Sequence, residues 1–203
     1  MGVVNADDDA SIMDGPAMLT WRSHDLTRIE STRVHVSGNR IKAYGRIASA
    51  ATDTHPAFSA SYDLITDDSG ATNRLSLTVS LAERDRQLSI SRDEENMWLI
   101  TDHQGQSRDA YDGALDVDVV LSPFFNALPI RRVGLHRRAD SVTLPLVYVN
   151  LPELTVGPAS SSYSSSGPDS GNGIKLLSPV AETTVVVDDD GFILDYPGLA
   201  ERI

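Results

Sequence analysis

Apolar and polar residues alternate over most of this chain, which is the pattern of β-strands that bury one face. The segment 75–81 is the clearest example, because four apolar residues alternate there with Ser76, Thr78 and Ser80. Aspartate-rich stretches that end in glycine, at 67–70 and 188–191, have the composition of hairpin turns. Further strands are predicted at 34–36, 41–47, 58–64, 88–90, 97–100, 133–135, 142–149, 183–187 and 192–196.

So many strands with no helices between them predict a mostly β fold, in which a many-stranded, largely antiparallel sheet curls on itself. One short helix is predicted at 122–128, because Ser122 suits an N-cap and is followed by proline at the first helical position. Pro129 is expected to end this helix near residue 128. The helix should lie inside the curled sheet, with four core residues: Pro123, Phe124, Phe125 and Leu128.

The length of 203 residues fits a single domain, taken here as 15–203. The acidic segment 1–14 is expected to be a disordered lead. The segment 158–173 is rich in serine, glycine and proline, and it is expected to be a mobile loop within the domain, since strands follow it.

The charged residues have an unusual composition. There are 22 aspartates and 7 glutamates, but only 2 lysines against 15 arginines, and the net charge is -12. Such a charge repels nucleic acids and anionic membranes. An excess of short carboxylates with little lysine indicates a surface adapted to high salt, where the Debye length falls to about 3 Å. No segment has the roughly 20 apolar residues of a membrane span or the features of a signal peptide, so the protein is expected to be soluble and cytoplasmic.

The sequence contains no recognisable catalytic or cofactor-binding motif. Cysteine is absent, the five histidines lack metal-ligand spacing, and no serine lies in a nucleophile elbow. The turn at 188–191 lacks the alternating ligands of a calcium loop. We therefore expect no cofactor, no metal and no enzymatic activity.

Two aspartates and two arginines flank the predicted helix. Asp116 and Asp118 share the polar face of a strand, and they could be an acid–base pair, a solvated surface, or partners of an arginine. Arg131 and Arg132 are expected in extended chain beyond the helix, on opposite faces. Neither face is purely polar, so one guanidinium is expected in apolar surroundings, where it needs an aspartate, a carbonyl or a ligand oxygen.

The same region resembles the bacterial and archaeal family named for glycolipid binding. The motifs are Asp116-Val-Asp118, Ser122-Pro123, Asn126, Leu128-Pro-Ile-Arg-Arg132 and the ending Asp195-Tyr-Pro-Gly-Leu199 with Arg202. Weaker matches are Trp21, Glu30, Tyr62, Arg74, Trp98, Tyr163 and Asp188. The resemblance implies a spiral β-roll around a single helix, similar in fold to periplasmic lipoprotein carriers, and a homodimer. Because both aspartates and both arginines belong to the motif, it also favours ion pairing between them.

The leading hypothesis is non-catalytic binding of an amphipathic ligand, such as a glycolipid or an isoprenoid-type lipid, in the concavity of the sheet. Its headgroup would meet Arg131, Arg132, Asn126 or Tyr196, and Asp118 would pair with Arg131 or Arg132. A second hypothesis is a structural or interaction protein with a filled interior, acting through a dimer surface. A carboxylate-based hydrolase is the third.

Overall fold

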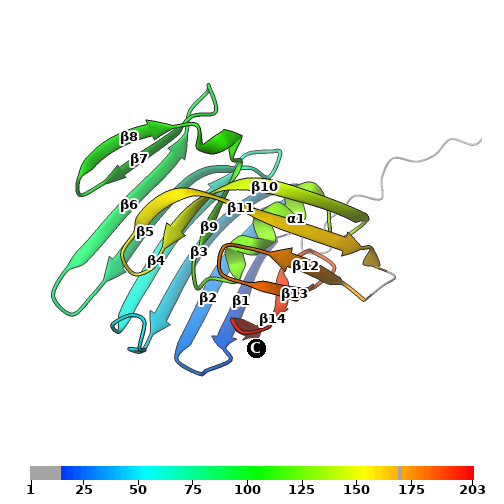
Figure 1. Cartoon of the computed structure of the whole chain (residues 1–203), viewed down its shortest axis with the longest axis horizontal. Coiled ribbons are helices and arrows are strands. Elements are labelled where there is room, and N and C mark those ends of the chain that lie inside the picture. The colour runs from blue at the N-terminus through cyan, green and yellow to red at the C-terminus, as the bar shows by residue number, and fades with distance from the viewer. Residues whose placement is uncertain (1–14, 169–170) are drawn as a thin grey trace, which may run out of the picture.

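The computed structural model describes residues 15–168 and 171–203, which form one curled sheet around a short helix (Figure 1). The first eight strands are β1 (Gly15–Ser23), β2 (Arg28–Ser37), β3 (Arg40–Ser49), β4 (Phe58–Thr66), β5 (Thr72–Ser80), β6 (Asp85–Arg92), β7 (Trp98–Asp102) and β8 (Gly105–Asp109). The remaining strands are β9 (Asp116–Val119), β10 (Ala139–Asn150), β11 (Thr155–Ser166), β12 (Gly173–Leu177), β13 (Glu182–Val187), β14 (Ile193–Tyr196) and β15 (Ala200–Arg202).

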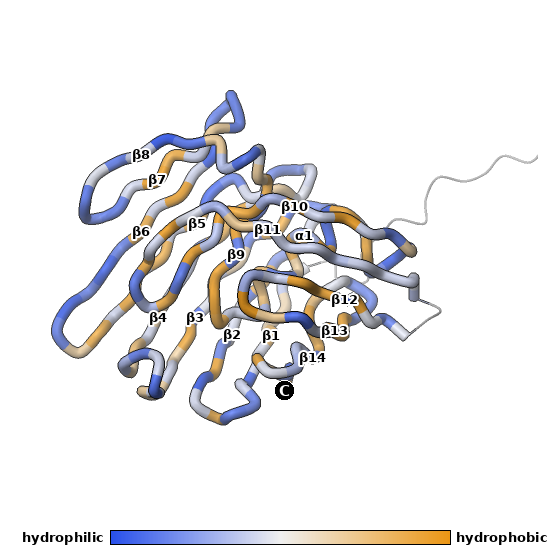
Figure 2. The backbone as a smooth tube through the Cα atoms, in the orientation of Figure 1, coloured by the Kyte–Doolittle hydropathy of each residue, from blue (hydrophilic) through white to orange (hydrophobic). Residues whose placement is uncertain are grey.

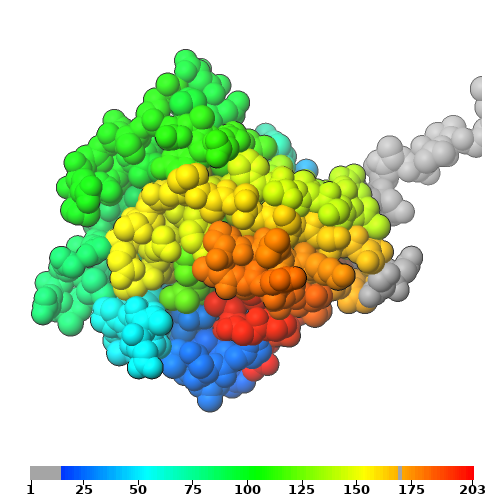
Figure 3. Space-filling view, viewed as in Figure 1, coloured from blue at the N-terminus to red at the C-terminus, as the bar shows by residue number. Residues whose placement is uncertain are grey.

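These 15 strands form a single sheet in the order β8-β7-β6-β5-β4-β3-β2-β1-β15-β14-β13-β12-β11-β10-β9. Each neighbouring pair is antiparallel except β9 and β10, which are parallel. The two ends of the domain meet where β1 pairs with β15, and the space-filling view shows the early and late strands side by side (Figure 3). The predicted fold class, a curled and largely antiparallel sheet, is confirmed.

The alternating pattern accounts for the first half of the sheet. In β5, Leu75, Leu77 and Val79 are buried while their neighbours face outward, and β2, β3 and β4 alternate in the same way. Figure 2 shows these stripes of apolar and polar residues along β4 to β6. The edge strand β8 is exposed along its whole length. One face of this half of the sheet therefore forms a continuous apolar wall.

The helix lies between that wall and the strands of the second half, β10 to β13, which cross in front of it in Figure 1. A 3-10 turn, η2 (Phe124–Asn126), leads into α1 (Ala127–Val133). Phe124, Phe125 and Leu128 pack in the larger of two apolar clusters, with the first half of the sheet, whereas Ile130 packs in the smaller one, with β11 to β14. The predicted core residues are buried, Pro123 included. The helix thus joins the two halves of the sheet.

The predicted bounds of the helix are wrong. Pro129 lies inside α1 and does not end it, because it is within the first turn, where the backbone N–H needs no intrahelical partner. The helix ends at Gly134, whose φ of 80° is left-handed. The N–H groups of Gly134 and Leu135 close this end by donating to the carbonyl of Ile130. Arg131 and Arg132 are therefore helical, and the strand predicted at 133–135 does not form.

Two further expectations concern low-complexity segments. The loop predicted at 158–173 is wrong for most of its length, since β11 continues to Ser166 in full pairing with β10. Serine and glycine supply little apolar signal there, but Ser161 and Tyr163 are buried, which is the strand alternation in a less obvious form.

The expected disordered lead, 1–14, lies outside the described residues. No helix in the described part of the chain is long and apolar enough to cross a membrane.

Candidate functional site

A cavity of about 560 Å³ opens at the start of the helix, between the two halves of the sheet. The residues after β9, from Val120 to Ser122, form one wall together with the first turn of the helix. The segment after β12, around Val180, and the turn 197–199 between β14 and β15 form the other. The lining residues are Thr54, His55, Asp118, Val119, Val120, Leu121, Ser122, Asn126, Tyr148, Leu151, Ser178, Val180, Ala181, Tyr196, Pro197, Gly198 and Leu199.

Asp118 is the buried carboxylate of this cavity. It is 8% exposed, and burial raises its pKa to about 7. The backbone N–H of Val119 opposes that rise, and the nearby charge of Asp116 adds to it. The predicted pairing of Asp118 with Arg131 or Arg132 is wrong, because Arg132 bonds to Asp116 and Arg131 bonds to the backbone carbonyl of Asp190. Asp118 therefore faces the cavity as a carboxyl group that can gain or lose a proton near neutral pH.

Hydroxyl and amide groups surround Asp118. The hydroxyl of Tyr148 is buried without a hydrogen-bond partner in the described structure. Burial, Asp118 and Tyr196 together raise the pKa of Tyr148 to about 12. Burial also raises the pKa of Tyr196, whereas a hydrogen bond with Ser178 lowers it. The amide oxygen of Asn126 accepts a hydrogen bond of 3.4 Å from the buried Tyr163. Tyr148 and Tyr196 keep their protons at neutral pH and can donate to a ligand.

A second buried carboxylate lies behind the wall of the cavity. Ser122 lines the cavity, and its hydroxyl donates to Glu30 Oε1 at 2.7 Å. Tyr62 donates to the same oxygen at 2.6 Å, and its own oxygen lies 2.6 Å from that of Thr32. Burial raises the pKa of Glu30 to about 7, and Glu30 Oε2 has no hydrogen-bond partner in the described residues. Sequence reasoning placed Glu30 and Tyr62 among the weaker family matches and missed this network.

An aspartate–arginine ion pair does form at the other end of the helix, but its aspartate is Asp116. Arg132 Nη2 donates to Asp116 Oδ2 at 2.6 Å, and Arg132 Nε lies 3.1 and 3.2 Å from the two carboxylate oxygens. Asp116 is completely buried, which raises its pKa, and the Arg132 guanidinium acts in the opposite direction. A second pair, Arg92 with Asp67, lies nearby and its charges also reach Asp116. A guanidinium that bonds both oxygens identifies Asp116 as a structural carboxylate.

Arg131 points elsewhere. Its guanidinium carbon lies 4.6 Å from the ring centre of Phe192, and Nη1 donates to the backbone carbonyl of Asp190. Burial lowers its pKa. The predicted site residues therefore divide into two groups. Asp118, Asn126 and Tyr196 line the cavity, whereas Arg131 and the Asp116–Arg132 pair lie at the end of the helix.

Two comparisons with known proteins identify the family and the fold. A family model described as "Putative glycolipid-binding" matches residues 18–202. The chain belongs to this family. Among solved structures, a DUF1089 family protein from Pseudomonas aeruginosa is similar over 96% of this chain and 97% of its own, with a TM-score of 0.70 and 21% sequence identity. At that identity the likeness concerns the fold. No curated protein matches the sequence.

Proposed function

We propose that this protein binds a glycolipid without chemical conversion, in the cavity at the start of the helix. The observation that carries the proposal is the composition of the cavity wall. A buried carboxylate, two tyrosines and a buried amide form its polar part, and Leu121, Leu151 and Leu199 form its apolar part. The volume of about 560 Å³ is in the ordinary range for a small-molecule site, roughly 300–1,000 Å³. The membership of a family named for glycolipid binding supports the same proposal.

The polar part suits the hydroxyl groups of a sugar. A carboxylate at Asp118 accepts hydrogen bonds, and the hydroxyls of Tyr148 and Tyr196 can donate or accept them. A buried hydroxyl without a partner, as in Tyr148, costs free energy that a ligand hydroxyl can recover. No arginine or lysine is among the described residues that line the cavity, so the headgroup contacts expected for Arg131 and Arg132 do not belong to this proposal.

The apolar part determines where a lipid chain can lie. Phe124 and Phe125 fill the space between the two halves of the sheet, in contact with Trp21, Tyr62 and Phe192. A chain running along the whole inner face of the sheet would have to displace them. We therefore place the lipid chain beside Leu121, Leu151 and Leu199. The chain would leave the cavity past Val180, which is 67% exposed at the rim.

Mass spectrometry of the organic extract from protein purified from its native host tests the proposal. We expect a stoichiometric lipid with a sugar headgroup, and we expect Asp118→Asn and Tyr148→Phe to reduce its occupancy. Glu182→Gln, on the exposed face of β13, is the matched control and should retain the lipid. Protein that carries no lipid and binds no alkyl glycoside would contradict the proposal and leave the interaction protein with a dimer surface as the better explanation. Release of free sugar from a bound glycoside would contradict its non-catalytic part.

A further inference from the structure

Four arginines gather at the end of the helix, within the eight residues 131–138 of a chain that has 15 arginines and a net charge of -12. They border a second cavity of about 310 Å³. Its lining residues are Asn39, Arg131, Arg132, Val133, Gly134, His136, Arg137 and Arg138, and none of these is acidic. This arginine-lined cavity is separate from the cavity proposed for the glycolipid, which lies at the opposite end of the helix.

The local fold holds these side chains in place. After the left-handed Gly134, the N–H groups of Arg137 and Arg138 both donate to the carbonyl of Gly134, which forms a tight turn. The two aspartate-rich hairpins pack against this end. A Cβ atom at Gly191 would lie 2.9 Å from Arg131 Cγ, and one at Gly70 would lie 3.5 Å from Arg132 Cβ. The two inner arginines, Arg131 and Arg132, are therefore packed against the backbone of these hairpins, whereas Arg137 and Arg138 are exposed.

Buried polar atoms in this cluster lack partners. His136 is 8% exposed, and neither of its ring nitrogens has a hydrogen bond of normal geometry among the described residues. The carbonyl of Ile130 lies near the ring and acts to raise its pKa, but it already accepts the N–H groups of Gly134 and Leu135. Arg131 Nε is also buried and without a partner in the described structure. Burial lowers the pKa of His136 to about 4, so at neutral pH its ring has one donor and one acceptor nitrogen. Buried donors without partners, that one and Arg131 Nε, indicate a site for a ligand that supplies acceptors.

We propose that this cavity binds a phosphate-type oxyanion. Guanidinium groups present pairs of N–H donors that match the oxygens of a phosphate, and charge-assisted bonds of this kind are the stronger ones. Arg132 is held by Asp116, and Arg131 by Phe192 and the Asp190 carbonyl, so both enter the site already oriented. The exposed side chains of Arg137 and Arg138 supply the outer donors. Asp116, Asp140 and Asp190 interact with these arginines but do not line the cavity.

The oxyanion could be free inorganic phosphate or the phosphate of a lipid headgroup, and titration calorimetry with two probes separates these sources. Inorganic phosphate and dihexanoyl phosphatidate are each titrated at an ionic strength held constant with potassium chloride. We expect saturable binding that weakens by about tenfold or more in Arg137→Gln/Arg138→Gln, since each charge-assisted bond is worth roughly that factor. Equal binding of the two probes identifies free phosphate as sufficient, and tighter binding of the phosphatidate identifies the headgroup.

Two controls make the result specific. Arg46→Gln/Arg84→Gln removes the same charge from exposed positions elsewhere and should leave binding unchanged. Asp118→Asn, at the other cavity, should also bind phosphate normally. Both arginines in the test variant are exposed, but Arg138 Nη2 also donates to the carbonyl of Val133 at 2.9 Å, so the melting temperatures of both double variants are measured beside the titrations. The proposal is overturned if neither probe gives saturable binding, or if the two double variants lose affinity equally.

Discussion

The buried carboxylates near the two ends of the central helix differ in their counter-charges. At the end of the helix, Asp116 is completely buried and the guanidinium of Arg132 bonds to both of its oxygens. At the start, Asp118 is nearly as buried. The backbone N–H of Val119 favours its charged form, but burial outweighs this and raises its pKa to about 7. One carboxylate is held in an ion pair, and the other is left facing a cavity.

This difference arises over two residues of one strand. Side chains two apart on a strand leave the same face, about 6–7 Å from one another. β9 pairs Asp116 with Leu146 and Asp118 with Tyr148, so the second carboxylate is carried away from the arginines of α1 and toward the tyrosines. A buried carboxylate with a counter-charge is a structural pair, and removing either partner destabilises the fold. A buried carboxylate without a counter-charge is a candidate for ligand contact.

Phe125→Ala should have the largest effect, because this ring packs in the larger apolar cluster at the start of the helix. Its centre is 5.0 Å from that of Tyr62 and 5.6 Å from that of Phe124, and it is fully buried. Truncating a buried phenylalanine typically costs about 3–5 kcal/mol. Urea denaturation measures the loss. Leu177→Ala, at a side chain 54% exposed, is the control and should cost much less. Equal losses would mean that Phe125 does not contribute to the core as its burial indicates.

Asp116→Asn should be nearly as costly, since it leaves Arg132 without its counter-charge. Breaking a buried ion pair by removing one partner costs roughly 3–5 kcal/mol. The same denaturation experiment on Asp112→Asn, at an exposed aspartate, should show a change within about 0.5 kcal/mol. If Asp116→Asn is as mild as this control, the contrast between the two ends of the helix does not hold.

The sequence predicts the strands well because alternation records burial directly, as at Leu75, Leu77 and Val79. It predicts the end of the helix poorly because two stop signals compete. Pro129 is tolerated in the first turn, and Gly134, which adopts the left-handed conformation, is the effective stop. Correct weighting of that glycine would have placed Arg131 and Arg132 on the helix.

The candidate site is only partly predictable for a different reason. Asp118, Asn126 and Tyr196 were identified from the sequence, and all three line the cavity. Tyr148 and Ser178 were not, because they come from strands and turns far apart in the chain and meet only after the sheet curls. The prediction that Asp118 pairs with an arginine is wrong, because the strand pattern gives Asp116 and Asp118 the same face and does not distinguish them.

The stability of the protein should depend on pH through Asp118. Its pKa is about 7 in the folded protein and near 3.8 in the unfolded chain, so the folded state holds the proton more tightly. Its contribution is fully present below about pH 4 and is lost as the pH rises through about 7. Glu30, whose pKa is also raised to about 7, adds to this trend.

Asp118→Asn isolates the first contribution. The variant should match the wild type near pH 4 and be more stable at pH 8, by up to about 4 kcal/mol if the whole shift of roughly three pKa units is expressed. Denaturant midpoints of both proteins across this pH range measure the difference. A variant that is destabilised at pH 8 would show that Asp118 has a positive partner in solution, and the contrast with Asp116 would disappear.

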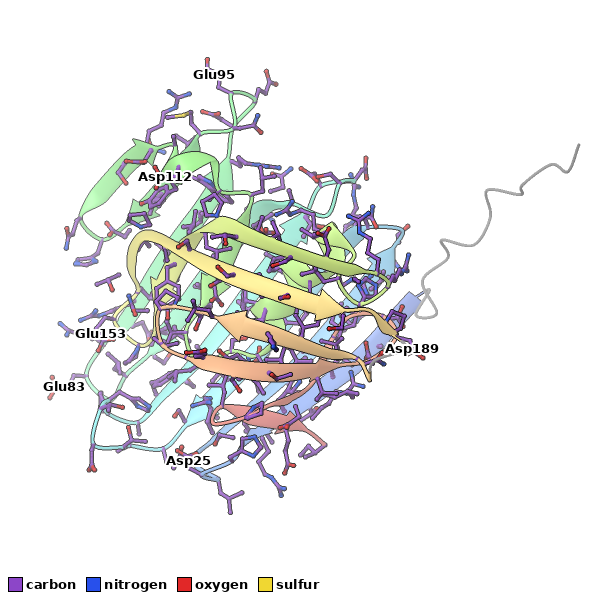
Figure 4. The ribbon with its side chains drawn as sticks, turned by 45° about the vertical axis from the view of Figure 1, so that its right-hand side comes forward. Asp25, Glu83, Glu95, Asp112, Glu153 and Asp189 are labelled. Atoms are coloured by element: carbon purple, nitrogen blue, oxygen red, sulfur yellow. The ribbon has the colours of Figure 1, made fainter. Side chains whose placement is uncertain are left out.

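Salt should have the smallest effect, and it should act on the surface. Acidic side chains such as Glu83, Glu95, Asp112 and Asp189 project outward around the molecule (Figure 4) and are exposed. Their mutual repulsion weakens as potassium chloride rises from low to molar concentration, so the melting temperature should increase. A change of 1 kcal/mol corresponds to about 2–4 °C for a domain of this size. A midpoint that stays flat or falls would remove the interpretation of a salt-adapted surface.

The same salt series also tests the buried pair. Salt screens exposed charges strongly and buried ones much less, and Asp116 is completely buried. The stability difference between the wild type and Asp116→Asn should therefore remain constant as salt increases, while the melting temperatures of both proteins rise together. A difference that shrinks with salt would mean that water and ions reach Arg132 and Asp116. Asp116 would then belong to a solvated ion pair, and its contrast with Asp118 would no longer be one between two buried carboxylates.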